Sequence, residues 1–165
     1  MKAGKLITTL FLILSFVIIT STCASTPKIV KTVEKGDSDK VETLIDEGAN
    51  VNEGDYLNRT ALMHATMKGD VEIVQMLIEA GANVNAVTDT LPPHPDVIII
   101  GIEEQYNCTA LMFACGATLL GYDVPEYRNP DIVKILIEAG ANVNVQNRMG
   151  RSALMYASAY GHTRT

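Results

Sequence analysis

The sequence predicts an all-α protein, a solenoid of stacked helix-turn-helix units joined by loops or hairpins. Three observations support this fold class. The pentapeptide Gly-Ala-Asn-Val-Asn occurs three times, at residues 48–52, 81–85 and 140–144. Each copy follows a stretch whose apolar residues have helical spacing. A second signature, Ala-Leu-Met, follows Thr60, Thr109 and Ser152.

The spacing of the pentapeptide indicates a repeat. Its first two copies begin 33 residues apart, at Gly48 and Gly81. The third begins at Gly140, 59 residues further on, which is one period plus 26 extra residues. A period of about 33 residues is typical of stacked supersecondary units, because one helix pair cannot bury its apolar face alone. The third unit is therefore expected to carry inserted residues.

The second unit carries the fullest set of signature residues. They are Thr60, Leu62, Ala65, Gly69, Val74, Leu77, Gly81, Ala82, Val84 and Asn85. In these residues, and over about residues 27–165, the chain resembles the ankyrin repeat family. That family opens its first helix with Thr-Pro-Leu-His-x-Ala. Here Ala replaces Pro, and Met63, Met112 and Met155 replace His. The resemblance implies an ankyrin-repeat solenoid.

Local chemistry predicts where the helices of this unit begin and end. The hydroxyl of Thr60 is expected to cap the first helix by accepting a backbone N–H. Gly69 and Gly81 are expected to end helices in the left-handed conformation that glycine favours. We expect the apolar stripe of the second helix to consist of Val74, Leu77 and Ile78.

Four units are expected, at about residues 27–52, 56–85, 106–144 and 147–165. Lysines in the first helix of unit one suggest a polar cap. Insertions lie near residues 86–105 and 117–130. The first is either passive decoration or a binding element, and the second is either a longer helix hairpin that packs on itself or a widened concave wall that touches a ligand. In the second insertion, Ala117–Leu120 should extend a helix and Pro130 should start the next. The fourth unit stops where its second helix should start. Either the array continues, or something else covers that end.

The first 24 residues have the layout of a secretory signal peptide. Lys2 and Lys5 precede an apolar run, Leu6–Ile19, which small residues follow. This layout predicts export to the periplasm or the cell exterior. Two alternatives remain open, namely an uncleaved membrane anchor and a lipoprotein lipidated at Cys23. The chain would meet a membrane only through this segment.

The composition argues against several classes of function. The net charge is −6, and nucleic acids or anionic membranes require a basic surface. Removal of residues 1–24 takes away two lysines and leaves 11 basic and 19 acidic residues, a net charge of −8. That charge suggests a partner with a basic patch. Cys108 and Cys115 are expected to be buried thiols outside any disulfide.

No catalytic, cofactor-binding or metal-binding motif stands out. The sequence has no Gly-rich phosphate loop, no CxxC pair and no HExxH. The histidines, His64, His94 and His162, are scattered. His64 falls at a core-facing helix position and is expected to be a satisfied structural residue. We therefore expect no enzyme, no cofactor and no metal.

The resemblance implies a non-catalytic protein–protein interaction module. Members of the family contact partners through loop tips and the concave lip of the first helix. The matching positions are Tyr56, Leu57, Arg59, Met67 and Lys68 in unit two, Gln105, Tyr106 and Cys108 in unit three, and Arg148, Met149, Arg151, Ala159 and Tyr160 in unit four. The alternative function is a lipoprotein scaffold in the cell envelope, anchored through Cys23.

Overall fold

The computed structural model describes residues 26–88, 106–117 and 129–159. Seven helices and no strand occupy these ranges, which confirms the all-α prediction. They are α2 (Lys28–Lys35), α3 (Ser38–Asp46), α4 (Ala61–Lys68), α5 (Val71–Glu79), α6 (Ala110–Ala114), α7 (Pro130–Glu138) and α8 (Ala153–Ala159). Each loop that leads into α4 and α8 closes through an isolated β-bridge, Gly54 with Thr60 and Gln146 with Ser152.

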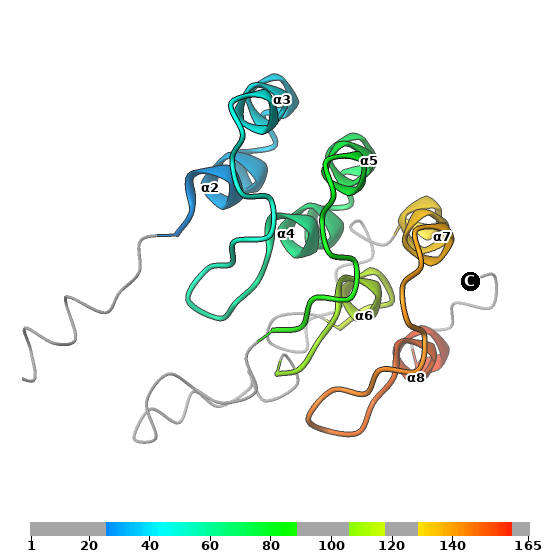
Figure 1. Ribbon diagram of the computed structural model, residues 1–165. Helices are drawn as coiled ribbons and strands as arrows, with labels where there is room; N and C mark the ends of the chain where they lie inside the picture. The colour runs from blue at the N-terminus through cyan, green and yellow to red at the C-terminus, as the bar shows by residue number, and fades with distance from the viewer. Residues whose placement is uncertain (1–25, 89–105, 118–128, 160–165) are drawn as a thin grey trace, which may run out of the picture.

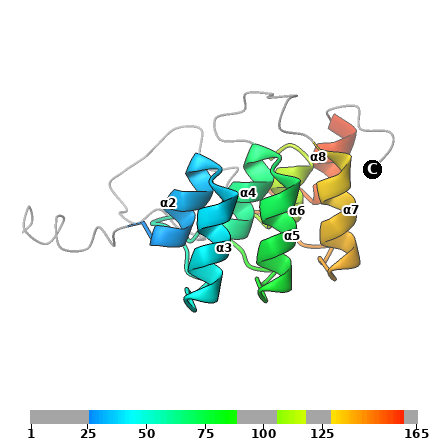
Figure 2. The same ribbon diagram turned by 90° about the horizontal axis from the view of Figure 1, so that it is seen from above.

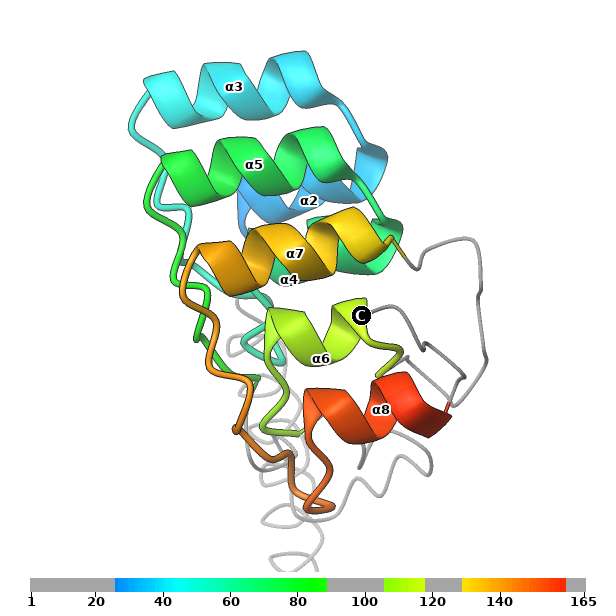
Figure 3. The ribbon, with the colours of Figure 1, turned by 90° about the vertical axis from the view of Figure 1, so that its right-hand side faces the viewer.

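The helices form two layers. Figure 1 looks nearly along them and shows α2, α4, α6 and α8 in one row and α3, α5 and α7 in the other. Viewed from above, the pairs follow one another in chain order (Figure 2). In the side view, the connecting loops gather along one edge of the stack (Figure 3). Helix α4 contacts α2, α5 and α6, so each unit packs mainly on its neighbours in sequence.

The predicted helix ends are confirmed in the second unit. The Thr60 hydroxyl accepts a hydrogen bond from the backbone N–H of Met63 at 3.4 Å, and Thr109 caps α6 in the same way. Gly69 follows α4 with φ 72° and Gly81 follows α5 with φ 85°. Asp70 caps α5, because its carboxylate accepts the N–H of Ile73.

The apolar stripe of α5 differs from the prediction at one residue. Val74 and Leu77 are fully buried, as expected, but Ile78 is only half-buried and Ile73 is fully buried. Successive helical residues are rotated by about 100°, so positions 73, 74 and 77 fall within one arc and position 78 falls outside it. The stripe therefore consists of Ile73, Val74 and Leu77.

Helix α6 is shorter than the sequence suggested. The prediction that Ala117–Leu120 extends it is wrong at Ala117, and residues 118–120 lie outside the described ranges. Gly116, with φ 109°, turns the chain away, and the N–H of Ala117 closes the helix end on the carbonyl of Met112. Pro130 does start α7, where its missing N–H costs nothing.

Candidate interaction surface

The last asparagine of the Gly-Ala-Asn-Val-Asn pentapeptide bonds its own unit to the turn that follows the second helix of the next unit. The Asn52 side chain donates to the carbonyl of Gly81 at 3.3 Å and accepts the N–H of Asn83 at 2.7 Å. Asn85 makes the same two bonds to Gly140 and Asn142, at 3.1 and 2.7 Å. Each carboxamide thus bridges two successive units.

Asparagines also align the loop tips. Asn58 and Asn107 have φ of 57° and 60°, a left-handed conformation that asparagine tolerates better than most residues. The Asn58 side chain donates to the carbonyl of Val87, and the Asn107 side chain donates to the carbonyl of Gln146. Successive tips are therefore bonded side by side and form a preformed row along one edge of the stack (Figure 3).

A buried polar cluster supports the second tip. The carboxylate of Asp55 accepts hydrogen bonds from Arg59 Nε at 2.7 Å and from its own loop's backbone N–H groups at Leu57 and Arg59. His64 Nε2 lies 3.1 Å from the same carboxylate, and His64 Nδ1 lies 3.5 Å from Glu34 on α2. The cluster thus ties the tip to α4 and to the preceding unit.

The electrostatics of this cluster keep Asp55 ionised. Burial alone raises its pKa, but the hydrogen bonds from His64 and Arg59 outweigh burial and hold the pKa well below the usual aspartate value. His64 is buried, its Nε2 is hydrogen-bonded to Asp55 and its Nδ1 lies 3.5 Å from a Glu34 carboxylate oxygen, so it serves the structure of the loop, as its position in the sequence suggested.

The candidate contact residues divide by exposure. Tyr56 and Met149 are each 54% exposed. Arg148, Arg151 and Lys68 are exposed, Met67 is half-buried, and Ala159 is exposed at the end of α8. Gln105, Tyr160 and the lipidation candidate Cys23 lie outside the described residues.

Four candidate contact residues are buried and unavailable to a partner: Leu57, Arg59, Tyr106 and Cys108. Leu57 and Tyr106 pack together as a small cluster between two tips. Arg59 points inward because it is paired with the buried Asp55 carboxylate. Sequence position alone could not distinguish Tyr56, which is exposed, from its neighbours.

The structure also separates Lys68 from the tips. Tyr56 precedes α4 and Lys68 ends it, so the helix length of about 12 Å lies between the two ends. Lys68 instead donates to the backbone carbonyl of Glu34 at 2.7 Å. Among the candidate contact residues, those exposed at the tips are therefore Tyr56, Arg148, Met149 and Arg151, which we call the loop-tip surface.

The two cysteines of the repeats are buried thiols outside any disulfide, as predicted. Cys108 and Cys115 are buried and no disulfide joins them. Burial raises the pKa of the Cys115 thiol to about 11. The thiol is the unreactive form, so Cys115 is no nucleophile at neutral pH.

The described residues contain no site suited to a metal ion. No group of three or more His, Cys, Asp or Glu side chains comes together there. In the same ranges, every helix is too short or too polar to cross a membrane. What these ranges do offer is a rigid row of loop tips on a helical stack.

The fold and the tip geometry define a class of protein, the helical repeat scaffolds that bind through a preformed surface. Comparison with known families makes this class specific. A model of ankyrin repeats, with three copies, matches residues 4–88 and 97–165. The chain belongs to the ankyrin repeat family, and such repeats are protein-binding modules that are generally non-catalytic. A search of curated proteins found no match to this chain.

Sequence reasoning did not predict the hydrogen bonds between units that Asn52, Asn85, Asn58 and Asn107 make. It also did not predict the buried cluster around Asp55. A signal was present for the asparagines. Asn58 and Asn107 both lie two residues before the capping Thr of α4 and α6, and Asn52 and Asn85 both close the pentapeptide. Recurrence at fixed repeat positions marked them as structural, but their partners lie in other units.

Proposed function

We propose that the loop-tip surface is where this module binds its protein partner. The observation that carries the proposal is the exposure of Tyr56 and Met149, each 54%, on tips that neighbouring units hold in place. Tyr, Met and Arg are enriched at protein interfaces, and Tyr and Arg often supply most of the binding energy. A preformed row of tips also loses little conformational entropy on binding.

The charges suggest the chemistry of that partner. Arg148 and Arg151 are exposed cations at the loop tip of unit four. Glu53 is an exposed carboxylate in the loop that leads to the tip of unit two. The helices α3, α5 and α7 instead expose seven carboxylates and two lysines. A partner with a basic patch, which the net charge suggested, would suit these helices. We propose that a partner at the tips presents an acidic patch to Arg148 and Arg151.

Site-specific photocrosslinking tests the proposal. A photoreactive residue would replace Tyr56 in the full chain, and a matched one would replace Glu72, which is exposed on α5. We expect an adduct with one defined protein at position 56, and loss of that adduct when Arg148 and Met149 are changed to Ser. Equal adducts at both positions, or none at position 56, would contradict the proposal.

We further propose that the module acts outside the cytoplasm. The support is the layout of residues 1–24, where Lys2 and Lys5 precede the apolar run Leu6–Ile19. These residues lie outside the described ranges. The intact mass of protein recovered from its native source tests this. Loss of residues 1–24 supports export. A lipid-modified Cys23 at the new N-terminus supports the envelope scaffold instead. An uncleaved chain in the cytoplasm contradicts both.

A further inference from the structure

One buried side chain of the stack lies between two carboxylates. His64 is 6% exposed, and its Nε2 lies 3.1 Å from Oδ2 of Asp55. Its Nδ1 lies 3.5 Å from Oε1 of Glu34, near the end of α2 in the preceding unit. One ring nitrogen of His64 therefore contacts the loop of its own unit, and the other contacts unit one.

These two contacts require two ring protons. An ionised carboxylate only accepts hydrogen bonds, so a ring nitrogen must carry a proton to donate to it. The imidazolium form of histidine carries a proton on both nitrogens, whereas the neutral ring has one nitrogen that donates and one that accepts. A neutral His64 therefore turns a lone pair toward one of the two carboxylates.

The charges of the cluster also balance only when His64 is protonated. Asp55 is ionised and pairs with Arg59. With Glu34 ionised and His64 protonated, two anions face two cations and their charges cancel. Loss of the proton from His64 leaves one negative charge without a counterpart in a mostly buried cluster, which is unfavourable.

Neighbouring helices supply no competing charge at this point. Helix α6 has no titratable side chain, and the carboxylates of α5, Glu72 and Glu79, are exposed. Lys68 donates to the backbone carbonyl of Glu34, and in the described ranges the one ion-pair partner of the Glu34 carboxylate is His64. The lysines of α2 and α4 are all exposed: Lys28, Lys31, Lys35 and Lys68.

The contact with Glu34 is the weaker of the two. The Asp55 carboxylate lies closer to the ring, and Arg59 and two backbone N–H groups hold it in place. Its side chain is 2% exposed, against 48% for the side chain of Glu34. A neutral His64 therefore keeps its proton on Nε2, next to Asp55, and the Glu34 carboxylate turns into water.

The chain itself shows which side chains can replace His64. At the same repeat position, unit three has Phe113 and unit four has Tyr156. Phe113 is buried and has no proton to exchange, and the Tyr156 hydroxyl accepts a hydrogen bond from Asn147 of its own unit. A ring of similar shape thus fills this position without a link to the preceding unit.

We infer that Glu34 and His64 form a pH-sensitive clasp between unit one and unit two. The clasp is closed when both ring nitrogens of His64 carry protons. It opens when the Nδ1 proton leaves to water, because Glu34 then has no donor. Acid conditions therefore tighten α2 on α4, and rising pH loosens it. The clasp is separate from the loop-tip surface and does not depend on it.

Nuclear magnetic resonance of the full chain tests the clasp at pH values from about 5 to about 9, which cover the range where histidines usually exchange their proton. Ring nitrogen shifts report the protons on His64, and hydrogen exchange reports how firmly α2 is held. We expect protons on both nitrogens at the acid end and on Nε2 alone at the alkaline end. Protection of the α2 amides, corrected for intrinsic exchange, should fall about two- to fivefold over the same interval.

Two variants remove the clasp. His64→Phe copies unit three, and Glu34→Gln removes the charge while keeping the shape of the side chain. We expect each to abolish the pH dependence of α2 protection. Glu34 is half-exposed, so the Glu34→Gln variant should fold even if His64→Phe does not. The matched control, Glu42→Gln, changes an exposed carboxylate on α3 and should retain the pH dependence.

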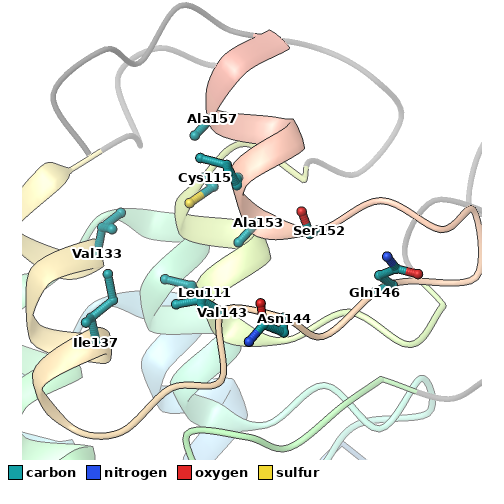
Figure 4. Close-up of a pocket in the computed structure, with 11 residues that line it drawn as sticks. Leu111, Cys115, Val133, Ile137, Val143, Asn144, Gln146, Ser152, Ala153 and Ala157 are labelled. Atoms are coloured by element: carbon teal, nitrogen blue, oxygen red, sulfur yellow. The ribbon is translucent and has the colours of Figure 1, made fainter.

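The apolar groove among α6, α7 and α8 provides an internal reference (Figure 4). Among the described residues that line it, Cys115 is the titratable one, and burial raises the pKa of its thiol to about 11. The amide signals of Val133 and Ile137, which line this groove from α7, should therefore stay constant over the titration.

Three results would overturn the clasp. The first is a His64 ring that keeps one protonation state over the whole pH range. The second is a neutral ring with its proton on Nδ1, which would leave Glu34 bonded. The third is α2 protection that changes with pH equally in the parent and in Glu34→Gln.

Discussion

At the scale of single residues, the clearest finding is that the same amino acid at the same repeat position has different surroundings. Asn85 bridges two units through a pair of hydrogen bonds, whereas Asn144 makes none with its carboxamide in the described part of the chain. This pair of residues allows a controlled test of how much the bridging bonds stabilise the stack.

We expect Asn85→Ala to lower the free energy of unfolding by about 1–2 kcal/mol, because two exposed hydrogen bonds between units are lost. Asn144→Ala is the matched control and should change it by less than about 0.5 kcal/mol. Urea denaturation followed by circular dichroism measures both. Equal losses in the two variants would show that the bridging bonds are not the source of the effect.

Asp55 makes stability depend on acid pH. Its pKa is held below the unfolded value, so its contribution is complete above about pH 4 and is lost as the pH falls further, through the folded pKa. We expect Asp55→Asn to cost about 3 kcal/mol at pH 7, because Arg59 is left buried without its carboxylate.

Urea unfolding at a series of pH values between about 7 and about 2.5 checks this prediction. This range extends above and below the pKa of about 3.9 that Asp55 has in the unfolded chain. The Asp55→Asn variant should lose less stability than the parent between about pH 4 and the acid limit. Asp39→Asn, at an exposed carboxylate on α3, is the control. A parallel pH profile for parent and Asp55→Asn would contradict the assignment.

At the scale of the helix, capping matters most where the helix is shortest. Helix α6 has five residues, and Thr109 accepts the N–H of Met112 at 3.3 Å. We expect Thr109→Ala to lower the free energy of unfolding by about 1 kcal/mol. Thr109→Ser keeps the hydroxyl and should recover most of that loss. Thermal and urea unfolding measure it, and an alanine variant as stable as the serine variant would rule out the cap.

At the scale of the whole molecule, position in the stack decides what a leucine contributes. Leu62 is covered by the neighbouring unit, whereas Leu154, at the equivalent position on α8, is 73% exposed. Leu62→Ala should therefore cost about 2–5 kcal/mol through lost burial and the cavity left behind. Leu154→Ala should change stability by less than about 0.5 kcal/mol. Denaturant unfolding of the two variants in parallel provides the check, and similar losses would contradict the exposure of Leu154.

Much of the fold could be predicted from the sequence because its determinants are local. Thr60 caps the helix that it immediately precedes, Gly69 ends the same helix, and Pro130 starts α7. The prediction for Ala117 failed because Gly116 adopts a left-handed conformation, which the sequence permits but does not require.

The candidate site was less predictable. Motif positions placed Tyr56, Leu57 and Arg59 together as contact residues, yet only Tyr56 is exposed. Leu57 packs on Tyr106 of the next unit, and Arg59 pairs with Asp55 beside His64. Whether a loop side chain points outward depends on neighbours that a single repeat does not contain.

The sequence by itself determined the helical units, their caps and their family, since these depend on residues a few positions apart. Only the tertiary structure decided which copies of a repeated residue are buried, bonded or exposed. Leu62 and Leu154, or Asn85 and Asn144, are identical in local sequence role. They differ because one of each pair lies between two units and the other lies beside α7 or α8, where the described part of the stack provides no further unit to cover it.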